Sequence, residues 1–261
     1  MESSIKLKKD ESILTITLNI PEKLNNLNLV MREELYMALL EAEKDEDVRV
    51  IVITGEGRGF CSGGDISSMD KEFTPAEGRA RMLSVHRLIR CIYRMNKFVI
   101  AAVNGPAVGA GCNLALACDF IIAAEEATFA EPFGRLGLIP DLGGLYFLPR
   151  RVGMAKAKEL IFTWQTLNGH EAERIGLVNR VVPLSELFVE VKKLAHKLLR
   201  GSALANGLSK IIINKSFEST LDQVLEEEAY AQALCFMSED FKEGVRAFLE
   251  KRRPEFGHKT D

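Results

Sequence analysis

Short apolar segments alternate with glycine-rich loops and helical segments along the first half of the chain, and this alternation limits the folds available to it. The stretches RVIVITG (49–55) and KFVIAAVNG (97–105) have the apolar, β-branched composition of buried parallel strands. The first runs into GEGRGFCSGGDI (55–66) and the second into GPAVGAGCNLALAC (105–118), both rich in glycine. Repeated alternation of buried strands and helices predicts an α/β domain with a largely parallel core.

Further patterns extend this prediction toward both ends of the chain. SIKLKKDESILTITLN (4–19) alternates apolar and polar residues on either side of Lys9-Asp10-Glu11, which predicts a hairpin. A helix is expected to follow Asn28, its N-cap, with one apolar face made of Met31, Leu35, Leu39 and Leu40. Residues 75–95 predict another helix, and DFIIAAEEATFAE (119–131) predicts two short strands.

The second half of the chain is mostly helical in pattern. After the Gly143-Gly144 pair, RIGLVNRVVP (174–183) is the one strand-like interruption, and from Ser185 onward the pattern indicates helices alone. Gly201-Ser202 is a loop inside this helical part and is not required to be a domain boundary.

Composition excludes several classes of function. The 261 residues, 47% of them hydrophobic, suffice for one core or for one domain with a smaller appendage. A formal net charge of −3 provides no basic field for nucleic acid or an anionic membrane. The chain has no apolar run of signal-peptide or membrane-spanning length, so a cytoplasmic protein is expected.

The five cysteines favour neither a disulfide framework nor a zinc site. Their number is odd, their spacing is irregular, and they contain no C-x-x-C pair. We expect reduced thiols, most of them buried.

Two glycine loops, FCSGGD (60–65) and GAGCN (109–113), follow buried strands directly or closely. A helix that begins at the second loop leaves its first backbone N–H groups unpaired, which favours an anion there. The spacing fits neither G-x-x-x-x-G-K-[ST] nor a clean G-x-G-x-x-G. The alternative is that the glycines serve only tight turns and close packing between helix and strand.

Asp141 is a lone acid in EPFGRLGLIPDLGG (131–144), between an Ile-Pro turn and a glycine pair. Its structural interpretation is an N-cap for the helix predicted in LGGLYFLPRRVG (142–153). Its functional interpretation is a desolvated carboxylate base.

Five segments together resemble the crotonase superfamily, the enoyl-CoA hydratases and isomerases. They occur in the order IPEKLNNLN (20–28), GFCSGGDI (59–66), AAVNGPAVGAGCNLALACDFIIAAEEATFAEP (101–132), LGLIPDLGG (136–144) and EDFKEGVRAFLEKRRPEF (239–256). The resemblance implies a crotonase (ClpP-like) spiral of β-β-α units over residues 1–200, followed by a helical C-terminal trimerisation region, 201–261. It also implies an acyl-CoA thioester substrate, no metal, no cofactor beyond the coenzyme A of the substrate, and a homotrimer or a dimer of trimers.

The resemblance assigns roles to individual residues. Backbone N–H groups of Gly64 and Ala110 would form an oxyanion hole for the thioester oxygen, and each such donor is worth on the order of 3 kcal/mol. The coenzyme A path would include Lys23 and Leu24 on the nucleotide side, then Ser62 and Ile66, while Asp65 would be a loop cap. Glu131 would face either the pocket or a subunit contact, and KRR (251–253) either solvent or the coenzyme A phosphates of a neighbouring subunit.

The sequence departs from the hydratases at both of their glutamate positions, which correspond to Asn113 and Phe133. Asn can orient a water but cannot accept its proton, and Phe can do neither. Asp141 resembles the catalytic aspartate of some family isomerases, and one carboxylate suffices to move a proton from C2 to C4 of an enoyl thioester. Phe133 and Leu138 are apolar neighbours in sequence that would raise the pKa of Asp141 by desolvation.

Isomerisation of an enoyl-CoA is therefore the leading hypothesis, and three alternatives stay open. A hydratase would use Asn113 or Asp141 in an unfamiliar way. A dehalogenase or hydrolase would use Asp141 as a nucleophile with His86 nearby, although a lone His on a helix is more often a surface or packed residue. An inactive acyl-CoA-binding homologue would have lost both glutamates.

Overall fold

The computed structural model describes residues 3–70 and 72–257, and within these ranges the main sheet has six strands in the order β1-β2-β3-β4-β6-β9. Only β1 and β2 pair antiparallel, as the hairpin pattern predicted, and the remaining neighbours are parallel. The strands are β1 (Ile5–Asp10), β2 (Ile13–Leu18), β3 (Val50–Gly55), β4 (Phe98–Val103), β6 (Phe120–Ala124) and β9 (Arg180–Val182).

A smaller sheet carries the second glycine loop. It joins β5 (Ala107–Val108), β7 (Thr128–Ala130) and β8 (Leu167–Asn168) in the order β5-β7-β8. Two residues form β8, too few for an alternating pattern, so the sequence did not predict it. The two sheets and the helices between them form the crotonase spiral that the resemblance implied.

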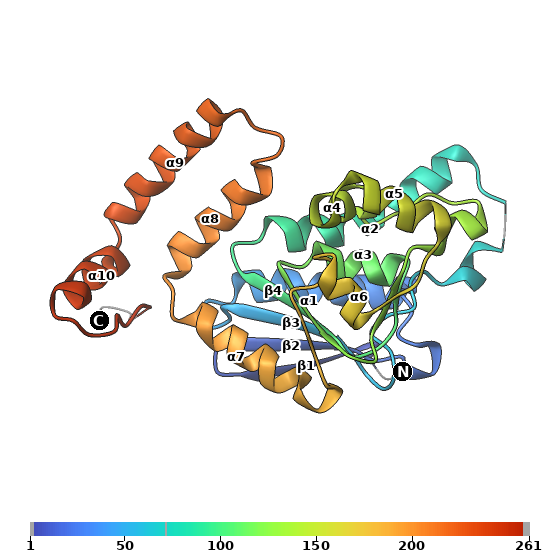
Figure 1. The fold of residues 1–261 in the computed structure, drawn as a ribbon, viewed down its shortest axis with the longest axis horizontal. Coiled ribbons are helices and arrows are strands. Elements are labelled where there is room, and N and C mark those ends of the chain that lie inside the picture. Colours follow the sequence, from blue (N-terminus) through green and yellow to red (C-terminus); the bar gives the residue numbers. More distant parts are fainter. Residues whose placement is uncertain (1–2, 71, 258–261) are drawn as a thin grey trace.

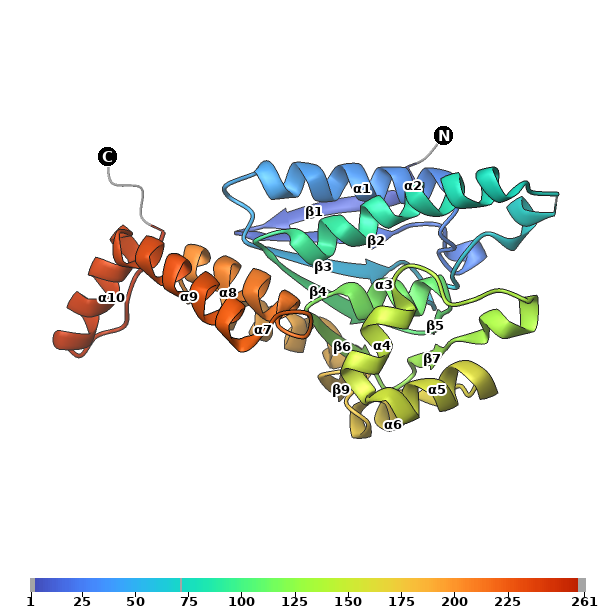
Figure 2. The same cartoon turned by 90° about the horizontal axis from the view of Figure 1, so that it is seen from above.

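The main sheet is covered on both faces because successive side chains along a strand point to opposite sides. From β3, Ile51 and Ile53 pack with buried side chains of α1 (Leu29–Lys44), α2 (Pro75–Arg94) and α3 (Ala110–Ala117). Val50 and Val52 pack on the other face, against α7 (Leu187–Leu199). Figure 2 shows α1 and α2 along one side of the strands.

Helix α1 begins as the sequence predicted. The Asn28 side chain accepts a hydrogen bond from the Met31 amide at 2.9 Å, and Met31, Leu35 and Leu39 are fully buried. Leu40, expected on the same apolar face, is only half-buried, and Ala38 takes a place in the core instead.

The second half of the chain contains α4 (Gly144–Val152), α5 (Met154–Thr163) and α6 (Gly169–Arg174) beside the small sheet. Short 3₁₀ helices connect elements along the whole chain: η1 (Pro21–Lys23), η2 (Ile66–Met69), η3 (Pro132–Leu136) and η4 (Leu184–Glu186). The last three helices form an arm that reaches away from the sheet (Figure 1). The arm consists of α8 (Ala203–Lys215), α9 (Leu221–Phe236) and α10 (Glu239–Leu249), and α9 buries no side chain.

Two further sequence predictions concern thiols and membranes. All five cysteines are free in the structure, and three of them, Cys61, Cys112 and Cys118, are buried, which agrees with the expectation that most are buried. Cys91 and Cys235 are half-buried. No helix within residues 3–70 and 72–257 combines the length and apolar composition needed to cross a bilayer.

Candidate active site

The two glycine loops lie against each other at the ends of β3 and β4. The Val108 amide donates to the Cys61 carbonyl at 3.0 Å. A side chain at Gly111 would place its Cβ 2.2 Å from the Cys61 oxygen, so only glycine permits this approach of the two backbones. Gly63 has a φ of +95°, and a Cβ there would lie 2.6 Å from the Val108 oxygen. Close packing is therefore one use of these glycines.

The same contact brings two backbone amides together. The position of a Cβ on Gly63 lies 3.3 Å from the Ala110 nitrogen, and Gly64 follows directly. Ala110 is the first residue of α3, so its N–H has no partner inside the helix. Among the hydrogen bonds of the described residues, neither the Gly64 nor the Ala110 N–H is a donor. The strand bridge between Leu27 and Gly64 does not use the Gly64 N–H, since the Leu27 amide donates to the Gly63 carbonyl at 2.7 Å. Two free donors on adjacent loops suit an anionic oxygen.

Asn113, one turn along α3, ties the loop of Asp141 to this helix. Its Nδ2 donates to the Asp141 carbonyl at 3.0 Å and to Glu131 Oε2 at 3.3 Å. Its Oδ1 is buried and has no hydrogen-bond partner among the described residues. The amide therefore positions a neighbouring acid but offers no group that accepts a proton at neutral pH.

The side chain of Asp141 is largely buried, and its Oδ1 lacks a partner within the described part of the chain. Burial raises the pKa of this carboxyl to about 6, although the charges of Arg32 and Arg81 act in the opposite direction. The N-cap interpretation is wrong, because Gly143 occupies the N-cap of α4 without any side-chain capping bond. Asp141 contributes only its carbonyl, which accepts from the Gly144 amide at 2.9 Å.

Glu131 lies in the interior of the protomer, 3% exposed, so of its two expected positions the subunit contact does not apply. Burial raises its pKa to about 8, against hydrogen bonds from Cys112 and Asn113 that lower it. The carboxyl is therefore mostly protonated at neutral pH. Its Oε2 accepts the hydrogen bond from Asn113 and so helps to fix the orientation of that amide.

The remaining predicted binding residues lie in three places. On the nucleotide side, Ser62 donates from its amide to the Leu24 carbonyl at 2.8 Å and from its hydroxyl to the Lys23 carbonyl at 3.0 Å. On the acid side, Phe133 is buried with its ring against Gly109, while Leu138 is 47% exposed although its amide bonds the Phe133 carbonyl.

The last two predicted binding residues follow Gly64: Asp65 is the N-cap residue of η2, and Ile66 is its first residue. Asp65 precedes η2 and accepts from the Ser67 hydroxyl at 2.6 Å, without capping a backbone amide by its side chain. Ile66 is 59% exposed.

Two residues near Asp141 were missed by sequence reasoning. Arg32 on α1 and Arg81 on α2 are both close enough to lower the pKa of Asp141. Neither residue stands in a recognisable motif, and only the packing of α1 beside α2 brings them together, so no local signal identifies them.

The geometry agrees with comparisons to known proteins. The family model described as "Enoyl-CoA hydratase/isomerase" matches residues 8–259. The chain belongs to the enoyl-CoA hydratase/isomerase family. The resemblance seen in the sequence is thereby confirmed, and with it the assignment as an enzyme whose family implies an acyl-CoA substrate.

Relatives within this family carry different names. The chain is 42% identical to a crotonyl-CoA hydratase of Syntrophomonas wolfei subsp. wolfei over 97% of each chain. It is 39% identical to a 1,2-epoxyphenylacetyl-CoA isomerase of Escherichia coli over 95% of each. A crystal structure of an enoyl-CoA hydratase from Bacillus anthracis superposes with a TM-score of 0.92 at 33% identity, covering 97% of this chain and 98% of that one. These names do not support our preference for isomerisation, because they favour hydratases.

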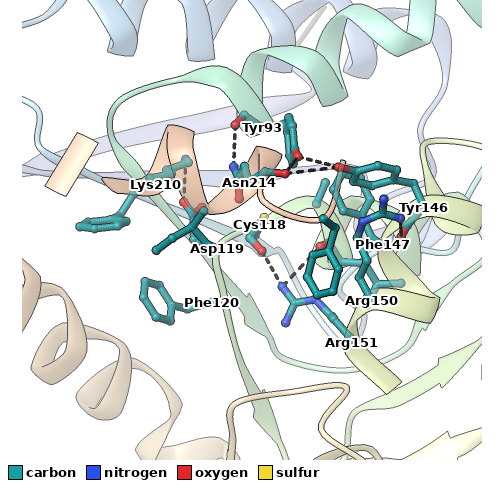
Figure 3. A pocket seen from close by; sticks show the side chains of 15 residues that line it. Tyr93, Cys118, Asp119, Phe120, Tyr146, Phe147, Arg150, Arg151, Lys210 and Asn214 are labelled. Atoms are coloured by element: carbon teal, nitrogen blue, oxygen red, sulfur yellow. Dashed lines mark hydrogen bonds and ion pairs between the residues drawn. The ribbon is translucent and has the colours of Figure 1, made fainter. Parts of the chain in front are cut away.

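A separate cavity of about 380 Å³ lies at the other end of α3, between α2, α4 and α8 (Figure 3). Its polar groups satisfy one another. Lys210 donates to Asp119 Oδ2 at 2.8 Å and to the Lys97 carbonyl at 2.8 Å, and Arg151 donates to the Cys118 carbonyl at 2.7 Å. The Tyr93 and Tyr146 hydroxyls share a hydrogen bond of 2.7 Å. These interactions join helices.

The structure also shows the surroundings of His86 and of the KRR segment (251–253), for which the sequence left alternatives open. His86 is half-buried on α2, and burial together with the charge of Arg90 lowers its pKa, which favours the neutral form. In KRR, Arg252 pairs with Glu243 and Glu250 just after α10, as expected for a solvated helix end.

Proposed function

We propose that this family enzyme is an enoyl-CoA isomerase that moves a double bond of an acyl-CoA thioester from C3–C4 to C2–C3. The observation that carries the proposal is the isolated Asp141 carboxylate, whose pKa of about 6 suits a group that both accepts and returns a proton. Asp141 is held beside the helix that presents the Ala110 amide.

The reaction requires one acid-base group and one site for developing charge. Asp141 removes a proton from C2 of the 3-enoyl thioester, and the electrons of that C–H bond form a C1–C2 double bond as the carbonyl electrons move onto the thioester oxygen, in conjugation with the C3–C4 double bond. The Gly64 and Ala110 N–H groups donate to this oxygen and stabilise the dienolate. Asp141 then returns the proton to C4, which leaves a C2–C3 double bond. No water is consumed, and the chemistry calls for no metal.

The surroundings of Asp141 support a single base. The Asn113 side-chain amide donates its N–H groups to Glu131 and to the Asp141 backbone carbonyl. Phe133 occupies the position at which the resemblance expects a second carboxylate, and its buried ring cannot bind a proton. Glu131 is the nearest additional acid, but it is buried and mostly protonated.

A second candidate is a hydratase, and the names of the relatives favour it. In that case Asp141 would activate a water for attack at C3 of a 2-enoyl thioester, and Asn113 would not participate in proton transfer. The site then has to supply both the base and the acid from one carboxylate.

Incubation in H₂¹⁸O distinguishes the two candidates. Purified enzyme is supplied with 3-hexenoyl-CoA or with 2-hexenoyl-CoA, and products are followed by mass spectrometry and by absorbance of the conjugated thioester. Conversion of the 3-enoyl to the 2-enoyl compound without ¹⁸O supports the isomerase. Gain of ¹⁸O supports the hydratase, and no reaction of either thioester rejects both for this acyl length and favours another substrate or an acyl-CoA-binding role.

We also propose that the arm of α8–α10 assembles copies of the chain into a trimer or a dimer of trimers, as the resemblance implies. The arm exposes large apolar side chains that water would disfavour in a monomer, including Phe217, Leu221, Tyr230, Met237 and Phe248. Light scattering after size-exclusion chromatography tests this: a trimeric or hexameric mass is expected, and a monomeric mass contradicts it.

A further inference from the structure

A cavity of about 480 Å³ lies between the first turn of α1, η2 and α2. It is lined by two arginines, one acid and small or apolar groups: Arg32, Arg81, Asp65, Asn28, Leu29, Val30, Ser68 and Ser84. The mechanism proposed above assigns no role to this cavity or to its arginines.

Both arginines donate hydrogen bonds to groups other than carboxylates. Arg32 donates from Nε to the Asn28 carbonyl at 3.2 Å, and Arg81 donates from Nη2 to the Ser68 hydroxyl at 2.9 Å. Neither forms an ion pair with a carboxylate of residues 3–70 and 72–257. Arg87 on α2 is different, because it pairs with Glu33 at 2.7 Å on the surface. The arginines of the cavity therefore retain donors for a ligand.

Positive charge is concentrated here. Burial and the charge of Arg81 lower the pKa of Arg32, and the charges of Asp141 and Asp65 oppose this shift, which indicates that the two guanidinium groups lie in one neighbourhood with both acids. Leu29 and Val30 belong to the first turn of the 16-residue α1, where the helix dipole also favours an anion. Asp65 offsets one of the two charges, and its Oδ1 is occupied by the Ser67 hydroxyl. An anionic group bound between the arginines would relieve their repulsion.

The position of the cavity indicates which part of a substrate reaches it. Arg32 and Arg81 both influence the titration of Asp141, the group that acts on the acyl carbons. Lys23 and Ser62, on the nucleotide side, contact each other and do not line this cavity. The acyl end of a thioester is thus the part directed toward the arginines.

We propose that Arg32 and Arg81 bind a carboxylate at the far end of the acyl group, so that the preferred substrates are coenzyme A monothioesters of unsaturated dicarboxylic acids. This inference rests on the proposed function for the orientation of the acyl group. Guanidinium groups suit this task because their planar N–H donors match a carboxylate.

Binding of saturated thioesters tests the inference without any turnover. Isothermal titration compares adipoyl-CoA with hexanoyl-CoA and with the neutral monoamide of adipoyl-CoA, and suberoyl-CoA with octanoyl-CoA to cover a second length. We expect the terminal carboxylate to tighten binding by about tenfold at one of the two lengths, within the range for hydrogen bonds to charged groups. Equal or weaker binding of both dicarboxylic thioesters overturns the inference.

Variants then assign the effect to the cavity. Arg32→Gln and Arg81→Gln are expected to remove the preference while keeping hexanoyl-CoA and free coenzyme A within twofold of wild type. Arg87→Gln, the matched change of an ion-paired surface arginine on α2, should keep the preference. Arg32→Lys preserves the charge and should retain part of it, and thermal unfolding verifies that each variant folds.

Other outcomes contradict the inference in distinct ways. If the arginine variants weaken free coenzyme A as much as adipoyl-CoA, the arginines bind coenzyme A phosphates. If ligand preference is unchanged but the pH profile of turnover shifts, the arginines only adjust Asp141. Because binding is measured on unreactive thioesters, a failure of the isomerase proposal appears in the ¹⁸O experiment and not here.

Discussion

Two partly buried aspartates lie near opposite ends of α3, and their surroundings differ. Asp119, just beyond the C-terminal end, accepts a hydrogen bond on Oδ2 from Lys210 at 2.8 Å (Figure 3). The Val99 amide donates to the same oxygen at 2.8 Å. Asp141, beside the N-terminal half, has a buried Oδ1 without a partner among the described residues. Burial raises the pKa of both carboxyls. A partnered acid joins parts of the fold, whereas an unpartnered one is available to a substrate.

The largest effect expected from this difference is on catalysis at Asp141. Asp141→Asn should lower kcat for 3-enoyl-CoA isomerisation by about 10³-fold, near the middle of the range for a general acid-base group. Binding of an unreactive acyl-CoA should change little, because the backbone carbonyl that Asn113 holds remains in place. Steady-state kinetics and titration measure the two quantities. Activity within tenfold of wild type would remove Asp141 from the mechanism.

The matching change at the other end of α3 should affect stability instead. Lys210→Met leaves the Asp119 carboxylate buried without its cation, which costs on the order of 3–5 kcal/mol of unfolding free energy. The turnover of the folded fraction should stay near wild type. Denaturant unfolding measures the loss, and Asp119→Asn combined with Lys210→Met should recover part of it. A stable Lys210→Met variant with impaired turnover would reverse the comparison.

Loss of one of the two proposed oxyanion donors should give the next largest effect, a fall in kcat. Ala110→Pro removes the N–H at the first position of α3, where proline is well tolerated in a helix. We expect kcat to fall by 10²–10³-fold, the typical consequence of losing one such donor. Ala110→Ser, which keeps the N–H, is the matched control and should retain most activity. Equal loss in both variants would indicate a steric effect rather than a lost donor.

The smallest effect is a gain in stability from Asp141→Asn. Because the folded-state pKa of Asp141, about 6, lies above its ordinary value of 3.8, the native state binds the proton more tightly than the unfolded state. Wild type therefore loses stability as pH rises from about 4 to above 6. Unfolding at pH 8 should show the variant more stable by up to about 3 kcal/mol, and at pH 4 the two should be equal. A variant less stable at pH 8 would contradict the unpaired state of Asp141.

The sequence predicted features that depend on local pattern. The N-terminal hairpin, the Asn28 cap and the buried strands follow from residue periodicity and capping chemistry, which act over a few residues. The hairpin turn lies at Glu11-Ser12, one residue beyond the expected centre, because Lys9 and Asp10 still pair with the second strand. The two glycine loops were also predicted, because close backbone approach requires glycine.

Features that depend on distant partners were not predicted. Lys210 and Asp119 are 91 residues apart, and Arg32 and Arg81 meet only because α1 packs beside α2. For Glu131 the sequence left a pocket and a subunit contact open, because its burial depends on the packing of distant segments, and in the fold a raised pKa makes its carboxyl mostly neutral. The N-cap interpretation of Asp141 failed because the glycine pair after it supplies the cap by backbone conformation.

Proton exchange at C2 tests the central claim most directly. Wild type and Asp141→Asn are incubated with 3-hexenoyl-CoA in D₂O, and deuterium at C2 of the remaining substrate and at C4 of the product is followed by NMR. The account predicts deuterium at these carbons with wild type and a rate at least 100-fold lower with Asp141→Asn, while both proteins bind the thioester equally. Exchange by Asp141→Asn at a rate close to wild type would show that another group moves the proton.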